Sequence, residues 1–158
     1  MVNVLFVCLG NICRSPTAHA LFQAQVNQAQ LEHKIKIGSA GTGGWHAGSP
    51  PDERAQKTAL EHGYDMSHLQ ARQVTTEDFS HFDYILAMDR QNLQDLKALA
   101  PSHYKGVLGL FLTESGVEFT DEVPDPYYGG EKQFEFAIQL VKDGVDGLLE
   151  RIRQEHQI

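Results

Sequence analysis

The chain opens with a nearly uninterrupted apolar segment, Val2 to Val7, in which Asn3 is the only polar residue. A strand with one solvent-exposed face alternates apolar and polar residues, whereas a strand buried on both faces is apolar throughout. Strands of the second kind occur almost only in parallel sheets that carry helices on both faces. The opening segment therefore predicts a protein of the α/β class.

A short loop and a helix are predicted to follow this strand. Ser15 is the expected N-cap, Pro16 the first helical residue, and apolar residues then recur at helical spacing as far as Ala29. The remaining strands are predicted at 34–39, 84–88 and 106–110, the remaining helices at 51–62, 90–100 and 134–152, and long loops at 39–51 and 113–130. The last helix has the clearest apolar stripe and is expected to pack across the sheet. This alternation predicts an open doubly wound four-stranded parallel sheet with helices on both faces.

Length and charge limit the classes of protein that remain. The 158 residues fit a single domain, residues 1–158. Thirteen Lys and Arg against 21 Asp and Glu give a net charge of −8, which argues against broad capture of nucleic acid or of an anionic membrane. No apolar run is long enough for a membrane span or a signal sequence, so we expect a cytoplasmic protein.

The chain has two cysteines, Cys8 and Cys13, too few and too close together for a disulfide framework. We therefore expect the two cysteines to have a chemical role. The histidines show neither metal-ligand spacing nor pairing with cysteine, and we expect no metal and no cofactor. They lie at positions 19, 33, 46, 62, 68, 81, 103 and 156.

The residues best suited to catalysis lie at the first strand–helix turn, between Cys8 and Arg14. Ligands of doubly wound sheets bind beyond the carboxyl ends of the strands, where Cys8 lies. Backbone N–H groups of residues 9–14 and the positive end of the helix can surround a phosphoryl group, and Gly10 and Asn11 tolerate the unusual φ angles this requires. The same field favours a nucleophilic thiolate at Cys8, and Arg14 offers a planar fork to two phosphoryl oxygens. The alternative is a buried strand cysteine and a surface arginine.

A proton donor is needed when a phenolate leaves a phosphate ester. Asp125 is a candidate because prolines flank it in a loop ending in Tyr127 and Tyr128, whose rings can wall a ring-shaped substrate. An ordinary turn aspartate is the alternative, and Asp121 is the substitute acid.

The segment Val-Leu-Phe-Val-Cys-Leu-Gly-Asn-Ile-Cys-Arg-Ser-Pro resembles the signature of the low-molecular-weight protein tyrosine phosphatase family. The resemblance continues through Ser39-Ala40-Gly41-Thr42, Pro50-Pro51-Asp52, Ala71-Arg72-Gln73, Phe82 to Asp89 and Asp125-Pro126-Tyr127-Tyr128-Gly129, so it covers essentially the whole chain. It implies a four-stranded parallel sheet and an enzyme in which Cys8 is the nucleophile, Arg14 the phosphate clamp and Asp125 the general acid.

Further roles follow from the resemblance. It implies that Ser15 hydrogen-bonds the thiolate and that Asn11, with Ser39 and His68 nearby, holds the shape of the loop. It also implies that Trp45 lines the cleft and influences substrate preference; the alternative is a tryptophan that plugs its own loop. The expected substrate-binding residues are Leu9, Gly10, Ile12, Trp45, Tyr127 and Tyr128.

The sequence leaves two interpretations open for Asp89 and two for Cys13. Asp89 follows a predicted strand and either orients Arg14 through a bidentate pair or caps the helix from Arg90. Cys13 either resolves an oxidised Cys8 by forming a disulfide, which would make the enzyme redox-regulated, or packs under the first helix.

The expected partners are a phosphotyrosine-containing protein or a small aryl phosphate, with inorganic phosphate as product and inhibitor. Neither nucleic acid nor membrane is expected, and the chain should be a monomer or weak dimer. Arsenate reduction on the same fold needs cysteines downstream of Cys13, which are absent. Phosphoarginine phosphatases resemble this chain but carry threonine where Ile12 stands, and Ile12 favours an aromatic ester. A non-catalytic phosphate-binding redox sensor is the remaining alternative.

Overall fold

The apolar opening segment forms β1 (Val2–Cys8), a central strand of the sheet, in which only Asn3 is not fully buried. The computed structural model describes residues 1–158. On one side β1 pairs with β2 (Ile35–Gly41), and on the other with β3 (Tyr84–Ala87), which in turn pairs with β4 (Val107–Leu110). All pairs are parallel and the order is β2-β1-β3-β4. The expected four-stranded parallel sheet is confirmed.

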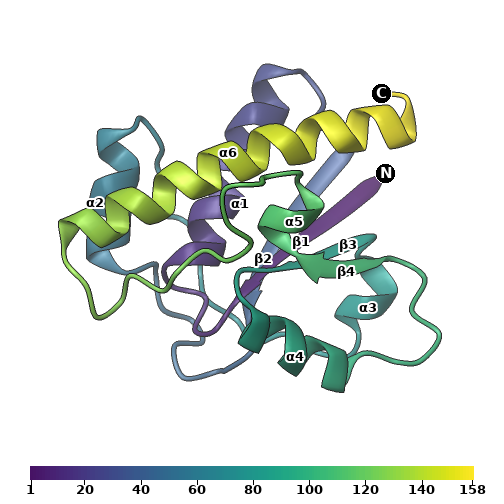
Figure 1. Ribbon diagram of the computed structural model, residues 1–158, viewed down its shortest axis with the longest axis horizontal. Helices are drawn as coiled ribbons and strands as arrows, with labels where there is room; N and C mark the ends of the chain where they lie inside the picture. The colour runs from purple at the N-terminus through teal and green to yellow at the C-terminus, as the bar shows by residue number, and fades with distance from the viewer.

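Helices cover both faces of this sheet (Figure 1). They are α1 (Arg14–Gln28), α2 (Glu53–Glu61), α3 (Asp78–His81), α4 (Arg90–Leu99), α5 (Phe111–Glu114) and α6 (Glu131–His156). Alternate residues of β1 serve the two faces, because successive side chains of a strand point to opposite sides. Leu5 and Val7 join the smaller apolar cluster with Leu96 of α4, and Phe6 joins the larger one.

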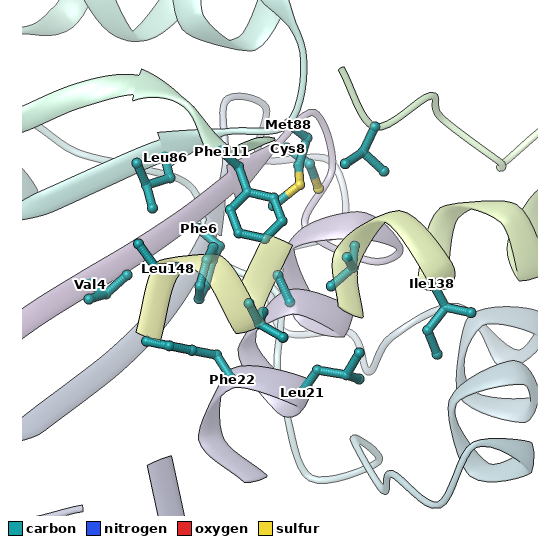
Figure 2. Packing of buried hydrophobic residues seen from close by; sticks show 14 of the residues in the cluster. Val4, Phe6, Cys8, Leu21, Phe22, Leu86, Met88, Phe111, Ile138 and Leu148 are labelled. Carbon is teal, nitrogen blue, oxygen red and sulfur yellow. The ribbon is translucent and has the colours of Figure 1, made fainter. Parts of the chain in front are cut away.

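Phe6 lies at the centre of the larger cluster (Figure 2). Its ring meets those of Phe22 and Phe111 edge to face, with centroids 5.7 and 5.4 Å apart. Edge-to-face pairs of this kind add to the stability gained by burial alone. Cys8 and Met88 lie in the same cluster, so the sulfur of Cys8 is at the boundary between the core and the first loop.

Helix α6 is longer than the predicted 134–152, and its buried stripe packs chiefly on α1, α2 and α5. It joins the same apolar cluster as β1 and β3, and its end bonds to Tyr84 of β3, so the expectation that it packs across the sheet is confirmed. None of the helices combines the length and the apolar character that a bilayer-spanning segment requires.

Several predicted boundaries are wrong. Helix α1 begins at Arg14, its N-cap is Cys13, and the side chain of Ser15 does not cap it. Strand β2 runs on to Gly41, two residues into the predicted loop, because its pairing with β1 continues to Cys8. The segment after Ala71 also meets its end, where Gly41 N–H donates to Arg72 O at 2.8 Å. The four-residue helices α3 and α5 were not predicted, and α5 lies partly in the second predicted loop.

Candidate active site

The loop from Cys8 to Arg14, called the Cys8 loop below, connects the carboxyl end of β1 to the first turn of α1. Asn11 has a φ of 58°, the left-handed conformation that asparagine tolerates. Gly10 has no positive φ, which corrects the reason expected for its presence. It serves by being small, because a Cβ there would lie 3.1 Å from the ring of His46.

The Cys8 sulfur is buried among hydrogen-bond partners. Ser15 Oγ lies 3.0 Å from it, and the backbone N–H of Asn11 points at it from 3.3 Å. Asn11 Nδ2 donates to Ser15 Oγ at 2.7 Å, and the hydroxyl also reaches Ala40 O at 3.3 Å. Since a hydroxyl has one proton to donate, Ser15 can give it either to Ala40 O or to the sulfur, and a thiolate would be the stronger acceptor.

Arg14 is 3% exposed and leaves part of its guanidinium free. Nη1 donates to Asp89 Oδ2 at 2.7 Å and to Val123 O at 3.0 Å, whereas the buried Nε has no partner. Burial alone would lower the pKa of Arg14, but Cys8 and the carboxylates of Asp89 and Asp125 raise it above its usual value. Arg14 is therefore a fixed cation with an unsatisfied donor.

Asp89 fulfils both of its alternative roles. One carboxylate oxygen accepts from Arg14, and the other caps α4 by accepting the N–H of Asn92 at 2.8 Å. The contact with Arg14 is therefore not bidentate. Asp89 links the guanidinium to the start of α4 at the carboxyl end of β3.

Asp125 lies in the loop between α5 and α6, on the same cavity as Cys8. Its Oδ1 accepts the N–H of Tyr127 at 3.1 Å, and its Oδ2 lies 3.6 Å from Arg14 Nη2. Asp121, the substitute acid, pairs with Arg90 and does not line the cavity.

The cavity has a volume of about 300 Å³. Its walls are Leu9, Gly10, Ile12, Cys13, Trp45, His46, Tyr127 and Tyr128, around Cys8, Arg14 and Asp125. Every expected substrate-binding residue is among them, and His46 is an addition. Trp45 is 72% and Tyr128 94% exposed, so their rings can pack on a ligand without any loss of core packing.

The expectation for His68 is wrong. His68 is exposed and makes no hydrogen bond to Asn11 or Ser39; it faces His19 across a separate hollow. The histidine at Ser39 is His19 of α1, whose Nδ1 lies 3.0 Å from Ser39 Oγ. Burial, with a smaller contribution from His68, lowers the pKa of His19 to about 4.

Two residues that support the site, Arg72 and His19, were not predicted from the sequence. Asn11 Oδ1 accepts the backbone N–H of Arg72 at 3.0 Å, across 61 residues of chain. His19 follows Ser15 by one helical turn, and that spacing was the available signal, since residues i and i+4 share a helix face. Ser15 and His19 both reach β2 from this face.

Cys13 is buried and is one of the walls of the cavity. Burial, followed by the neighbouring Asp52 carboxylate, raises the pKa of its thiol above the usual value, so Cys13 carries its proton. No group of three or more His, Cys, Asp or Glu side chains in the structure is arranged to hold a metal ion.

Comparison with known proteins adds independent findings. Residues 3–158 match the family model of low molecular weight phosphotyrosine protein phosphatases. The low molecular weight protein-tyrosine-phosphatase YfkJ of Bacillus subtilis is 45% identical over 162 aligned residues, covering all of both chains. A crystal structure of a protein tyrosine phosphatase from Entamoeba histolytica, with Hepes in its active site, has a TM-score of 0.93 at 38% identity over all of both chains. A Drosophila arginine phosphatase has a TM-score of 0.89 at 30% identity, covering 97% of this chain and 98% of its own.

Proposed function

Since the chain belongs to the low molecular weight phosphotyrosine protein phosphatase family and is a phosphotyrosine phosphatase, we propose which of its residues carry out the hydrolysis. Cys8 is the nucleophile, Arg14 the phosphate clamp and Asp125 the general acid and base. The observation that supports this assignment is that the Cys8 sulfur, a fixed arginine with a free buried Nε, and a carboxylate line one cavity.

In the first step the phosphoryl group binds to the N–H groups of the Cys8 loop and to Arg14. The Cys8 thiolate attacks phosphorus, so that an S–P bond forms while the ester P–O bond breaks. The bonding electrons go to the leaving oxygen, which takes a proton from Asp125. Arg14 and the loop amides stabilise the charge on the phosphoryl oxygens in the transition state.

In the second step the Asp125 carboxylate removes a proton from water, which attacks phosphorus. The S–P bond breaks, inorganic phosphate is released, and the thiolate returns with the Ser15 hydroxyl as its hydrogen-bond donor. Released phosphate occupies the same site and therefore inhibits. Asn11 and Asp89 position the loop and the guanidinium, and Ser39 supports the loop through its contact with His19.

We propose an aryl phosphate, either free or as phosphotyrosine in a protein, as the substrate. The walls that support this choice are apolar or aromatic: Leu9, Ile12, Trp45, Tyr127 and Tyr128. A phosphoarginine guanidinium would need polar partners there, and Ile12 offers none. Because an arginine phosphatase shares the fold, phosphoarginine is the substrate to compare directly.

We further propose that residues 1–158 act as one cytoplasmic domain, a monomer or weak dimer without a cofactor. Redox control is proposed as well, with Cys13 resolving an oxidised Cys8. The support is that both thiols are free and belong to the same loop.

A pair of serine variants tests the assignment of the nucleophile. Cys8→Ser should lose hydrolysis of phenyl phosphate, whereas Cys13→Ser, the same change five residues away, should retain turnover. EDTA should leave the wild-type rate unchanged, and phosphoarginine should be hydrolysed far more slowly than phenyl phosphate. Turnover by Cys8→Ser comparable to wild type would show that another group is the nucleophile.

A further inference from the structure

Arg54 lies next to the cavity without being one of its walls. It is in the first turn of α2, and its guanidinium lies over two aromatic rings: its central carbon is 5.3 Å from the centroid of Tyr127 and 4.9 Å from that of Phe134. Tyr127 is a wall of the cavity, whereas Phe134 is buried near the start of α6. Arg54 thus connects a cavity wall to the core.

Tyr127 is partly buried and packs against the main apolar cluster. Its backbone N–H donates to Asp125, and its ring meets that of Tyr128 edge to face at 4.9 Å. Tyr128 is 94% exposed and gives little rigidity to its neighbour. In addition to that packing, the guanidinium of Arg54 lies over the Tyr127 ring and can hold its orientation.

Arg54 is itself held by Asp52. Nε donates to Asp52 Oδ1 at 3.1 Å and Nη2 to Oδ2 at 2.9 Å, a two-point contact that lysine cannot form. Asp52 is the N-cap of α2, and its backbone N–H donates to Ile12 O in the Cys8 loop at 2.8 Å. A continuous chain of contacts thus runs from the Cys8 loop through Asp52 and Arg54 to Tyr127.

We propose that Arg54 is a positioning residue that sets the preference for aryl phosphates, by holding Tyr127 against the ring of the substrate. This inference rests on the proposed function, in which Tyr127 is one of the aromatic walls. The phosphoryl group itself binds to the Cys8 loop and to Arg14. Arg54 therefore affects the binding of the substrate's aromatic ring and not the binding of its phosphoryl group. Arg54 is a positioning residue because it acts through Tyr127.

Two ligands distinguish an effect on ring binding from an effect on phosphoryl binding. Benzylphosphonate carries a ring, and inorganic phosphate does not. Titration calorimetry with Arg54→Met should show benzylphosphonate binding weakened by about 2- to 5-fold, the size of a cation–π contact at an exposed site. Inorganic phosphate should bind as it does to wild type. Arg54→Lys should resemble Arg54→Met, because its ammonium lacks the planar fork.

Arg151 provides a matched control. Its guanidinium lies 5.8 Å from the centroid of Tyr84 and pairs with Glu114 and Glu155, the same kinds of contact at a site remote from the cavity. Arg151→Met should leave the ratio of the two dissociation constants unchanged. A second control uses Tyr127→Leu, in which Arg54→Met should have no further effect on the ratio.

Three results would overturn the proposal: an unchanged ratio in Arg54→Met, equal weakening of both ligands, or effects of Arg54→Met and Tyr127→Leu that simply add. Binding is measured without turnover, so these results leave the assignment of Cys8 untouched. If wild type bound benzylphosphonate no better than phosphate, the aromatic walls of the proposed function would be wrong, and the role of Arg54 with them.

Discussion

Arg14 contacts side chains and backbone from several segments of the site. Its aliphatic stem is buried, one end of its guanidinium is held by Asp89 and Val123, and its Nε remains free. Nε has no protein partner, so a phosphoryl oxygen can accept a hydrogen bond from it without displacing a protein group. The donor is therefore already in place when substrate binds.

Replacement of Asp125 by Asn tests the general acid. The amide cannot protonate a leaving group, so single-turnover phosphorylation by phenyl phosphate should slow by about 10²–10⁴-fold. Nitrophenyl phosphate needs less protonation and should slow less. The control is Asp121→Asn, which removes a carboxylate of the same loop that pairs with Arg90. Equal slowing on both substrates would assign Asp125 a structural role.

His19 should make stability depend on pH. Its pKa is about 4 in the folded protein, against an ordinary value of 6.5, because burial disfavours the charged ring. Below pH 6.5 the unfolded chain binds a proton that the folded chain does not, so the free energy of unfolding falls as pH falls towards 4, by at most about 3 kcal/mol.

Urea unfolding of wild type and His19→Gln at several pH values measures this contribution. The difference between the two proteins should shift in favour of the variant below pH 6.5, while His33→Gln, at an exposed histidine, should follow wild type throughout. A difference that is the same at every pH would contradict a depressed pKa.

Cys13 is expected to protect Cys8 during oxidation. Peroxide converts the Cys8 thiolate to a sulfenic acid, and attack by the Cys13 sulfur forms a disulfide and releases water. Since burial raises the pKa of the Cys13 thiol, little of it is thiolate and we expect this step to be slow, and phosphate in the cavity should slow inactivation. Mass spectrometry should find the disulfide, and dithiothreitol should restore activity.

The matching control is Cys13→Ser, which should recover less completely because its Cys8 proceeds to irreversible oxidation states. Recovery as complete as that of wild type would show that Cys13 is a packing residue.

Sequence distance limits which site residues a local pattern can predict, and the distant ones, such as Asp125 and Trp45, were expected chiefly from the family resemblance. Cys8 and Arg14 stand in one short segment between a strand and a helix, so their proximity follows from local structure. Asn11 and Arg72 meet across 61 residues, and Ser39 chooses His19 instead of His68. Those contacts depend on how α1 and the segment after α2 pack on β2, which no local pattern determines.

Among the elements, buried strands and the long helix were the most predictable, because their apolar patterns are strong. The short helices α3 and α5 contain four residues each and have no periodicity to detect. Strand β2 exceeds its prediction because its ladder with β1 continues to the pair Cys8–Gly41, and glycine gives no sequence signal for a strand.

The contact between α6 and α5 depends on a glycine. A Cβ at Gly147 would collide with the carbonyl oxygen of Ser115. Gly→Ala in a helix interior ordinarily stabilises by roughly 0.5–1 kcal/mol, but here α6 would have to move away from α5, and we expect a net loss of about 1–3 kcal/mol.

Urea unfolding of Gly147→Ala measures that loss. Gly130→Ala is the control, since a Cβ at that helix start meets only ordinary contact distances. A Gly147→Ala variant more stable than wild type would show that the helices separate without cost.

The whole molecule carries a net charge of −8 and yet contains a site for an anion. This is consistent because the site uses short-range donors, namely the Cys8 loop amides, the start of α1 and one buried arginine. The doubly wound topology brings the carboxyl ends of β1 and β3 together, which places Cys8 and Asp89 around Arg14. The general location of the site was therefore predictable from the fold class.

The central claim is that the phosphoryl group passes through the sulfur of Cys8. Rapid denaturation during turnover of nitrophenyl phosphate, followed by mass spectrometry of the peptides, tests it directly. We predict one phosphoryl group on the peptide that contains Cys8, in larger amount for Asp125→Asn, which hydrolyses the intermediate slowly, and none for Cys8→Ser. A phosphoryl group on another residue, or its absence from every peptide while product forms, would contradict the account.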